Sequence, residues 1–343
     1  MHARMRVVAL GSAFAAIALA NPILAIAQPG GGGGAPGGGA AGGGGGGQRQ
    51  PAALVWAPKP TQLTEYEAPN RPLWKLTDVL AMHQGQASWR QPIIRDALLE
   101  ADYVQMAPGQ STPRQFFGDT RSWFMVWDGQ VRVNINGVEP FVASKGYMVQ
   151  VPLMVDYSLE VVGNTPALFF DVRVTGSPLY YTDVNLTPPA TPGVTWYRGS
   201  RSAPRAAQLD TAAAVPTYSD GRRVYVDFFK EVVEGAGPFR PSAFVDDDRG
   251  FFNVIRGRGA PTPPETNLGH FHTYGTEFWF IPEGTIEVLI EGVGLVSGGP
   301  GDIITAAEGR FHRAGAAGDG MSTRIATNGY PEGLHVYQTP EGQ

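Results

Sequence analysis

From about Leu73 onward, apolar and polar residues alternate with a period of two along short segments that Gly and Pro interrupt. Residues 129–137 and residues 284–292 show this alternation most clearly. In each, three β-branched residues fall on one face of an extended chain: Val131, Val133 and Ile135 in the first, Ile286, Val288 and Ile290 in the second. Short alternating segments bounded by turn residues predict an all-β fold of the sandwich or barrel type.

Two stretches depart from this alternation. Thr77, followed by Asp78 and four apolar residues up to Met82, predicts a short helix with Thr77 as its N-terminal cap. Residues 93–99 predict a second short helix. The expected fold is therefore all-β with a few short helices.

The two alternating segments belong to an internal repeat. An offset of 155 residues carries three glycines of the first copy onto glycines of the second without a gap: Gly129 onto Gly284, Gly137 onto Gly292 and Gly146 onto Gly301. Such an offset is typical of a duplicated domain. The sequence therefore predicts one fold that occurs twice.

The N-terminal region resembles an export signal. A short basic start is followed by an apolar run to Ala20 and by Ala25-Ile26-Ala27, a small-x-small cleavage site. Residues 29–50 are mostly Gly, which cannot bury enough apolar surface to fold. The predicted organisation is a signal peptide (1–27), a disordered Gly/Pro-rich linker (28–70), an N-terminal barrel (71–186), an inter-domain linker (187–221) and a C-terminal barrel (222–340). A periplasmic or secreted location follows from this prediction.

Charge and composition narrow the class of partner. The net charge is −5 without basic blocks, which argues against nucleic acid as a partner. No later segment approaches the roughly 20 apolar residues of a membrane span. The chain has no Cys, so disulfides are excluded. A small molecule is the expected partner, and assembly into a homo-oligomer is left open.

Candidate metal ligands cluster in the second copy. His270, His272 and Glu277 lie within eight residues, and on an extended strand the two histidines project to the same face. His312, which follows the turn at Gly309, is the candidate fourth ligand from a distant strand. Imidazole nitrogens and a carboxylate oxygen suit a single divalent transition metal such as Mn, Fe, Ni, Cu or Zn. The alternative is that these are hydrogen-bonded polar residues in the mouth of a barrel.

These residues resemble the two motifs of the cupin superfamily. The first, G-x5-H-x-H-x4-E-x6-G, is met at His270, His272, Glu277 and Gly284, and the second, G-x5-P-x-G-x2-H-x3-N, at Gly301, Gly309 and His312. Pro264, Ala307 and Ala316 depart from these motifs without removing a ligand. The resemblance covers both copies and implies two small jelly-roll barrels, with a metal inside the second.

The first copy lacks the ligands. The offset maps the four candidate ligands onto Gln115, Phe117, Ser122 and Tyr157. None of these replaces an imidazole or a carboxylate as a transition-metal ligand. The N-terminal barrel is therefore expected to bind no transition metal and to serve as a structural partner, with a cavity for a ligand of its own as the alternative.

Three residues near the ligands are candidates for the pocket. Trp279 and Ile281 should face the same way as Glu277, and core filling is the alternative for Trp279. Arg310 lies close to His312 and could pair with an anionic substrate, with a solvated turn residue as the alternative. No catalytic residue is identified.

Three functions fit this sequence. The resemblance to quercetinase-like and oxalate-oxidising cupins implies a metal-dependent oxidoreductase that acts on a small oxygenated molecule with O2. A redox-neutral isomerase, lyase or decarboxylase would use the metal as a Lewis acid only. A non-catalytic binding protein would capture a small molecule or a metal outside the cytoplasm.

Overall fold

A computed structural model describes residues 56–182, 185–187, 193–197, 223–235, 244–246, 249–258, 268–329 and 334–337. The predicted signal peptide (1–27), residues 28–55 and most of the predicted inter-domain linker (187–221) lie outside these ranges. Among the described residues, the fold is mostly β, and none of the helices has the length and apolar character needed to span a bilayer.

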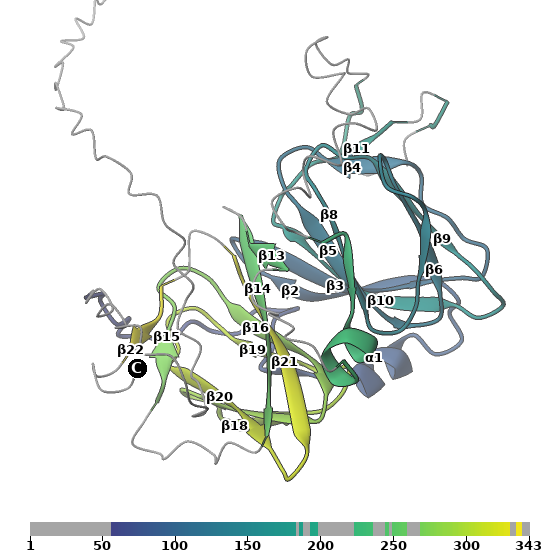
Figure 1. The fold of residues 1–343 in the computed structure, drawn as a ribbon. Helices are drawn as coiled ribbons and strands as arrows, with labels where there is room; N and C mark the ends of the chain where they lie inside the picture. Colours follow the sequence, from purple (N-terminus) through teal and green to yellow (C-terminus); the bar gives the residue numbers. More distant parts are fainter. Residues whose placement is uncertain are drawn as a thin grey trace, which may run out of the picture. The chain divides into compact units, whose positions relative to one another are not determined.

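The first barrel is built from two antiparallel sheets (Figure 1). A six-stranded sheet has the order β12-β8-β5-β10-β3-β2, and a five-stranded sheet the order β11-β4-β9-β6-β7. The strands are β2 (Trp89–Arg95), β3 (Leu99–Met106), β4 (Gln115–Phe117), β5 (Ser122–Asp128), β6 (Val131–Ile135), β7 (Phe141–Ala143), β8 (Tyr147–Val151), β9 (Tyr157–Val161), β10 (Ala167–Val174), β11 (Leu179–Tyr181) and β12 (Tyr225–Asp227).

The second barrel repeats this plan. Its sheets have the orders β1-β19-β16-β21-β14-β13 and β18-β17-β20-β15-β22. The strands are β1 (Leu73–Trp74), β13 (Val245–Asp246), β14 (Gly250–Arg258), β15 (His270–Phe271), β16 (Glu277–Glu283), β17 (Thr285–Ile290), β18 (Gly294–Gly298), β19 (Ile303–Ala306), β20 (His312–Ala317), β21 (Met321–Gly329) and β22 (Val336–Tyr337). The predicted pair of jelly-roll barrels is confirmed.

The repeat holds at the level of strand register. Three cross-strand pairs of the first barrel map onto pairs of the second with the same offset of 155 residues: Gln115 with Tyr157 onto His270 with His312, Ser122 with Val151 onto Glu277 with Ala306, and Val131 with Val161 onto Ile286 with Ala316. The offset found from glycines therefore also aligns the backbone pairing around the candidate ligands.

The chain crosses between the barrels at both ends of the first one. β1 precedes the first barrel in sequence but pairs with β19 of the second, Leu73 lying opposite Ile304. β12 follows the first barrel and pairs with β8, Tyr225 lying opposite Val149. The observed exchange of strands thus differs from a simple division at residues 71–186 and 222–340.

Three apolar clusters form the core. One fills the first barrel and another the second, each between the barrel's two sheets. A third cluster joins the six-stranded sheets of both barrels, with Phe170 stacked on Phe280 (ring centroids 5.4 Å apart) and Trp123 on Phe252 (4.4 Å). Each central strand therefore buries one face inside its barrel and the other against the opposite barrel, which explains why β5 and β16 are buried almost throughout.

The helices differ in part from the expectation. Helix α1 (Leu76–Met82) is present, but its N-terminal cap is not Thr77: the Leu76 N–H donates to Asp302 Oδ1 (3.0 Å), 226 residues away. The helix predicted at residues 93–99 is wrong. Those residues complete β2 and form a turn in which Asp96 Oδ1 accepts from the N–H groups of Leu98 and Leu99 (both 2.7 Å). A short π-helix, η2 (Phe228–Val233), was not expected.

Residues 56–70, part of the predicted disordered linker, are in contact with the second barrel. Lys59 Nζ donates to the Gly309 carbonyl (2.7 Å), and the Tyr66 hydroxyl donates to the Thr305 carbonyl (2.8 Å). Both acceptors flank the turn that leads to His312. The composition explains the difference, because the Gly-rich run ends at Gly47 and polar side chains that can anchor the chain follow it.

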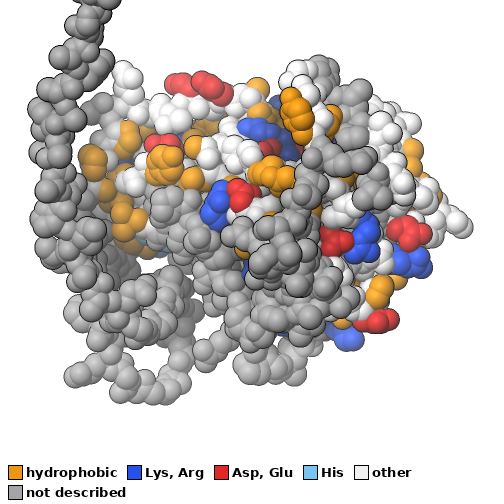
Figure 2. Space-filling model, turned by 90° about the horizontal axis from the view of Figure 1, so that it is seen from above, with side chains coloured by type: hydrophobic (Ala, Val, Ile, Leu, Met, Phe, Trp, Pro, Cys, Tyr) orange, Lys and Arg blue, Asp and Glu red, His pale blue; other side chains and the backbone are white. Residues whose placement is uncertain are grey.

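Charged side chains of both signs are mixed on the surface. On the face drawn in Figure 2, Lys and Arg lie close to Asp and Glu, and the described residues form no broad area of one sign there. Elsewhere among the described residues, charges of opposite sign are paired, as in Arg132 with Glu160 (2.9 Å) and Arg256 with Glu283 (2.8 Å). On the face in Figure 2, the described residues form no continuous basic stripe of the kind that binds a phosphate backbone.

Candidate metal centre

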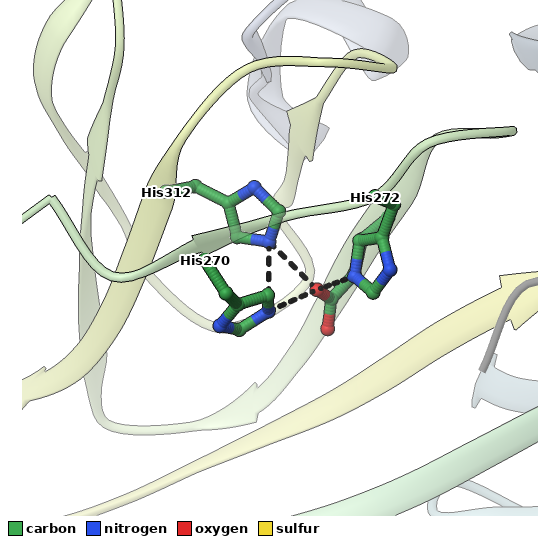
Figure 3. Close-up of side chains that lie close together, drawn as sticks. His270, His272 and His312 are labelled. Carbon is green, nitrogen blue, oxygen red and sulfur yellow. Dashed lines mark hydrogen bonds and ion pairs between the residues drawn. The ribbon is translucent and has the colours of Figure 1, made fainter. Parts of the chain in front are cut away.

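The four predicted ligands meet in the second barrel (Figure 3). His270 lies in β15, His272 directly follows that strand, Glu277 begins β16 and His312 begins β20. One potential donor atom from each side chain falls within 4.8 Å of all the others. The structure therefore brings together residues up to 42 positions apart into one group of three imidazoles and one carboxylate.

A single carboxylate oxygen is the focus of this group. Glu277 Oε2 lies 2.9 Å from the Nε2 atoms of both His272 and His312, and 3.5 Å from Nε2 of His270. The Nε2 atoms of His270 and His312 are 3.1 Å apart. All three histidines thus present the same ring nitrogen to the centre of the group.

Local backbone geometry sets this convergence. His270 pairs with His312 across β15 and β20, so their side chains leave neighbouring strands on the same face. Gly269 has a positive φ of 82°, and a Cβ atom there would lie 2.1 Å from the His312 carbonyl oxygen. The Gly309 N–H donates to the His272 carbonyl (2.9 Å), which ties the turn before His312 to the end of β15. Only glycine allows the backbones to approach this closely at position 269.

The environment of His312 fixes its tautomer. His312 Nδ1 lies 2.9 Å from the Arg310 carbonyl oxygen, which can only accept a hydrogen bond. Nδ1 is therefore assigned as an N–H donor to this carbonyl, and Nε2 is the ring nitrogen that faces Glu277. A carbonyl that orients a ligating imidazole in this way is a common feature of metal sites.

Burial and hydrogen bonding favour the ligating protonation states. Burial lowers the pKa of His270 to about 3, so this imidazole is neutral at ordinary pH. Burial alone would raise the pKa of Glu277, but hydrogen bonds with the three histidines outweigh it and hold that pKa well below its usual range. A neutral imidazole and an ionised carboxylate are the forms that bind a cation.

The donor set fits a divalent transition metal. Three imidazole nitrogens and one carboxylate oxygen lie within 4.8 Å of one another, so a single cation could accept a lone pair from each of them. Three nitrogen donors and one oxygen donor are compatible with several first-row metals, so the residues do not select one ion.

The group is open on one side. The side chains of His272 and His312 are each 1% exposed, whereas that of His270 is 19% exposed. His335 and Tyr337 lie next to His270, with ring centroids 4.4 and 5.4 Å from it. A small molecule from solvent would therefore reach the centre past His270, His335 and Tyr337.

Sequence reasoning missed His335, which none of the motifs includes. β22 pairs with β15, so Tyr337 lies opposite His270 and His335 reaches the rings of His270 and His272. The repeat held a signal for this placement: the offset maps His335 onto Tyr180 in β11, a strand that pairs with β4 as β22 pairs with β15.

Two residues of β21 also belong to the surroundings of the site. Asn328 Nδ2 lies 3.3 Å from His272 Nε2. Arg324 is on the same side of the strand as Asn328 and Ala326, which faces the interior of the second barrel. Burial lowers the pKa of Arg324, the charge of Glu277 acts in the opposite direction, and its Nε is buried without a hydrogen-bond partner among the described residues.

The three pocket candidates lie in different surroundings. Trp279 is 2% exposed and its ring meets that of His312 edge-on at 5.3 Å. Ile281 is fully buried in the apolar cluster inside the barrel. Arg310 is 5% exposed, and its guanidinium donates to the carbonyls of Thr64 and Glu291 instead of facing the ligands. These bonds make Arg310 an anchor for residues 64–66.

Other side chains occupy the equivalent place in the first barrel. Gln115 Nε2 lies 3.3 Å from the Tyr157 hydroxyl, and Ser122 also hydrogen-bonds Tyr157. Phe117, at the position of His272, is 7% exposed. A polar cluster without imidazoles or carboxylates therefore stands where the second barrel has its donor set.

Comparison with known proteins gives distant structural similarity. No family model matches the chain, and no curated protein matches it in sequence. Two crystal structures of salicylate 1,2-dioxygenase from Pseudoaminobacter salicylatoxidans are similar. A mutant in complex with gentisate has 13% sequence identity and a TM-score of 0.47, and the match covers 76% of this chain and 85% of that chain. Another structure of the enzyme has 12% identity and a TM-score of 0.47, with 75% of this chain and 87% of that chain covered. A mutant of Bacillus subtilis oxalate decarboxylase is also similar, with 12% identity and a TM-score of 0.39, and the match covers 75% of this chain and 76% of that chain.

Proposed function

Starting from a chain of two cupin-type barrels with a three-histidine, one-glutamate donor set in the second, we propose that the protein is a metal-dependent oxidoreductase of the dioxygenase or oxidase type. Its substrate is a small oxygenated organic molecule. The observation that carries this proposal is the convergence of three imidazole nitrogens on one carboxylate oxygen that is ionised although buried.

The proposed ligands are His270, His272, Glu277 and His312, which together would hold one divalent metal. When bound, such a metal polarises a substrate oxygen and, if it is redox-active, exchanges electrons with O2. His312 is fixed for this role by the Arg310 carbonyl and His272 by burial, so two imidazoles are held in place before a metal arrives.

Arg324 supports an anionic group on the substrate. A guanidinium Nε that is buried without a hydrogen-bond partner is costly unless an acceptor reaches it. Ala326 and Ile255, which pairs directly opposite Arg324, offer no acceptor, and the Asn328 side chain on the same face makes no hydrogen bond to this Nε. A carboxylate or enolate oxygen of the substrate would supply the missing acceptor within the barrel that holds the ligands.

The remaining side chains control access and exclude water. Trp279 covers His312 from inside the barrel, so solvent is kept from that side. On the open side, the His335 ring and the Tyr337 ring flank His270. These two side chains would contact the outer part of a bound substrate and select for its size.

The experiment combines metal analysis with oxygen uptake. The full mature chain is purified without added metal, its metal content is measured, and O2 consumption is followed with hydroxylated aromatic acids and with small dicarboxylic and keto acids. We expect about one transition metal per chain and O2 uptake with at least one of these acids. His272→Ala should lose both, whereas His83→Ala, which removes an imidazole bonded to Gln91, should keep both.

Two outcomes would replace this proposal. Product formation or CO2 release without O2 uptake would assign a redox-neutral isomerase, lyase or decarboxylase. Saturable binding of an acid without turnover would assign a binding protein. Unchanged metal content in His272→Ala would contradict the assignment of the metal site itself.

Export is a separate proposal that rests on residues 1–27 alone. We propose a periplasmic or secreted location, which N-terminal sequencing of the mature protein tests. A first residue near Gln28 is the expected result.

A further inference from the structure

The first barrel contains a cavity of about 330 Å³. Two of its lining residues, Gln115 and Tyr157, are the offset equivalents of the ligands His270 and His312. The cavity thus occupies the place that corresponds to the metal centre of the second barrel. Its volume falls at the lower end of the range found for small-molecule sites.

One part of the cavity wall offers neutral hydrogen-bonding groups. Tyr157 is 5% exposed, and its hydroxyl lies 3.3 Å from Gln115 Nε2. Burial raises the pKa of Tyr157 to about 12, so the hydroxyl keeps its proton. A phenolic O–H and a primary amide can each donate and accept a hydrogen bond. This part of the wall can therefore bind a hydroxyl or a carbonyl group.

Apolar side chains make much of the remaining wall. Phe124 and Phe169 lie close together, with ring centroids 5.6 Å apart, and both are almost completely buried. Leu159, Met106, Val104 and Trp89 form the rest of the apolar lining. Such a wall favours a flat, weakly polar ring, because aromatic side chains contact other rings well by stacking or edge-on.

The charges at the cavity compensate each other. Arg90 and Asp171 line it, and they form an ion pair with Arg90 Nη1 3.2 Å from Asp171 Oδ2. Arg90 also pairs with the buried Asp102, and Arg173 pairs with both aspartates. Because each charge already has a partner of opposite sign, the cavity offers no unpaired charge to an ionic ligand.

We propose that this cavity is a second ligand site, which binds an uncharged hydroxylated aromatic molecule of the phenol class. The ring lies against Phe124, Phe169 and Leu159, and the hydroxyl bonds to Tyr157 and Gln115. The site works without a metal and does not depend on the function proposed for the second barrel.

The test uses 4-methylphenol as the probe and isothermal titration of the full mature chain after removal of metal with a chelator. We expect saturable binding of one molecule per chain. Toluene, which lacks the hydroxyl, should bind about tenfold more weakly, the effect of losing a hydrogen bond of roughly 1.4 kcal/mol. The 4-methylbenzoate anion should bind more weakly still, because a buried charge has no partner in the cavity.

Variants assign the binding to the first barrel. Tyr157→Phe should weaken binding of 4-methylphenol about tenfold and leave binding of toluene unchanged, a pattern that general loss of packing would not give. Tyr180→Phe is the matched control, because Tyr180 is 48% exposed and lies outside the cavity lining. Leu159→Trp should fill the cavity and abolish binding of both probes.

Three results would overturn the proposal. They are the absence of saturable binding by the wild-type chain, equal affinity for 4-methylphenol in the wild type and in Tyr157→Phe, and loss of binding in His272→Ala. The last result would place the probe in the second barrel. Because the titration is done without metal, the absence of binding would not contradict the oxidoreductase function proposed for the second barrel.

Discussion

Replacing Arg310 by Met distinguishes between two possible roles of this residue, binding of an anionic substrate and stabilisation of the fold. If Arg310 bound an anionic substrate, the change would weaken substrate binding without affecting the fold. The structure instead directs its guanidinium at main-chain carbonyls, with Nε and Nη2 donating to Thr64 O (3.0 and 2.6 Å) and Nη1 to Glu291 O (2.7 Å). We therefore expect Arg310→Met to destabilise the fold.

The magnitude follows from the acceptors that lose their partner. Methionine keeps much of the apolar volume of the side chain but cannot donate, so the carbonyls of Thr64 and Glu291 lose this donor. Thr64 is exposed and Glu291 is partly exposed, so water can reach both acceptors; at roughly 1 kcal/mol for each acceptor, the free energy of unfolding should fall by about 2 kcal/mol. The contact of the guanidinium with the Tyr66 ring, 5.0 Å from its centroid, is lost as well.

The assay is urea-induced unfolding of wild type and variant, with metal content measured on the same samples. Metal content should not change, because His312 is oriented by the main-chain carbonyl of residue 310, which any residue supplies. Residues 56–66 should also become more accessible to proteases, since Thr64 and Tyr66 lose an anchor. Arg313→Met, which changes a partly exposed arginine of β20, is the matched control.

An unchanged free energy of unfolding in Arg310→Met, together with weaker substrate binding, would refute this reasoning. It would return Arg310 to the role of a substrate-binding residue.

Three further changes test other parts of the structure. Gly269→Ala should lower metal content several-fold, because a Cβ atom would meet the His312 carbonyl at 2.1 Å at a position with φ of 82°; full metal loading would contradict the close approach. Replacing Gln115 by His should leave metal content at about one per chain, since Phe117 and Ser122 still cannot complete a donor set; elemental analysis that finds two metals would contradict this. Asp102→Asn should cost about 3 kcal/mol in urea unfolding near neutral pH, because a fully buried carboxylate paired with three arginines loses its charge.

The same aspartate gives a pH dependence whose sign is fixed. Burial works to raise the pKa of Asp102, but the charges of Arg173 and Arg90 outweigh it and hold that pKa below its usual value. A carboxyl whose pKa is lower in the folded state stabilises the fold above its unfolded pKa of about 3.9, and this contribution is lost as the pH falls through the folded pKa. Wild type should therefore lose more stability than Asp102→Asn on acidification below about pH 4. Equal losses would contradict this.

The ligand set could be predicted from the sequence because its members are held by local patterns. His270, His272 and Glu277 are close in sequence, and Gly309 marks the turn before His312. The repeat of 155 residues then gave the fold, because strand registers were duplicated together with the glycines. A pattern of a few residues was sufficient to predict the structure wherever that structure depends on residues close together along one strand.

The sequence-based predictions were wrong or incomplete where residues far apart in the chain determine the local structure. Residues 93–99 resemble a short helix, but Ile93 and Ile94 lie in the edge strand β2 and are buried in the apolar cluster that joins the two barrels. Periodicity cannot distinguish a helix from a strand over so few residues. The cap of α1 comes from Asp302, in the other copy of the repeat. Arg324 and His335 reach the metal centre through β21 and β22, whose pairing with other strands no local pattern records.

The exchange of β1 and β12 determines how the protein can be divided. If the chain is cut between the two barrels, β1 is separated from β19 or β12 from β8. The sheet that loses its strand is then left with an uncovered edge. The two barrels should therefore depend on each other for folding. The first barrel lacks the metal donor set, yet its apolar face is half of the core that it shares with the second barrel, so a chain without it should have neither a stable second barrel nor a metal centre.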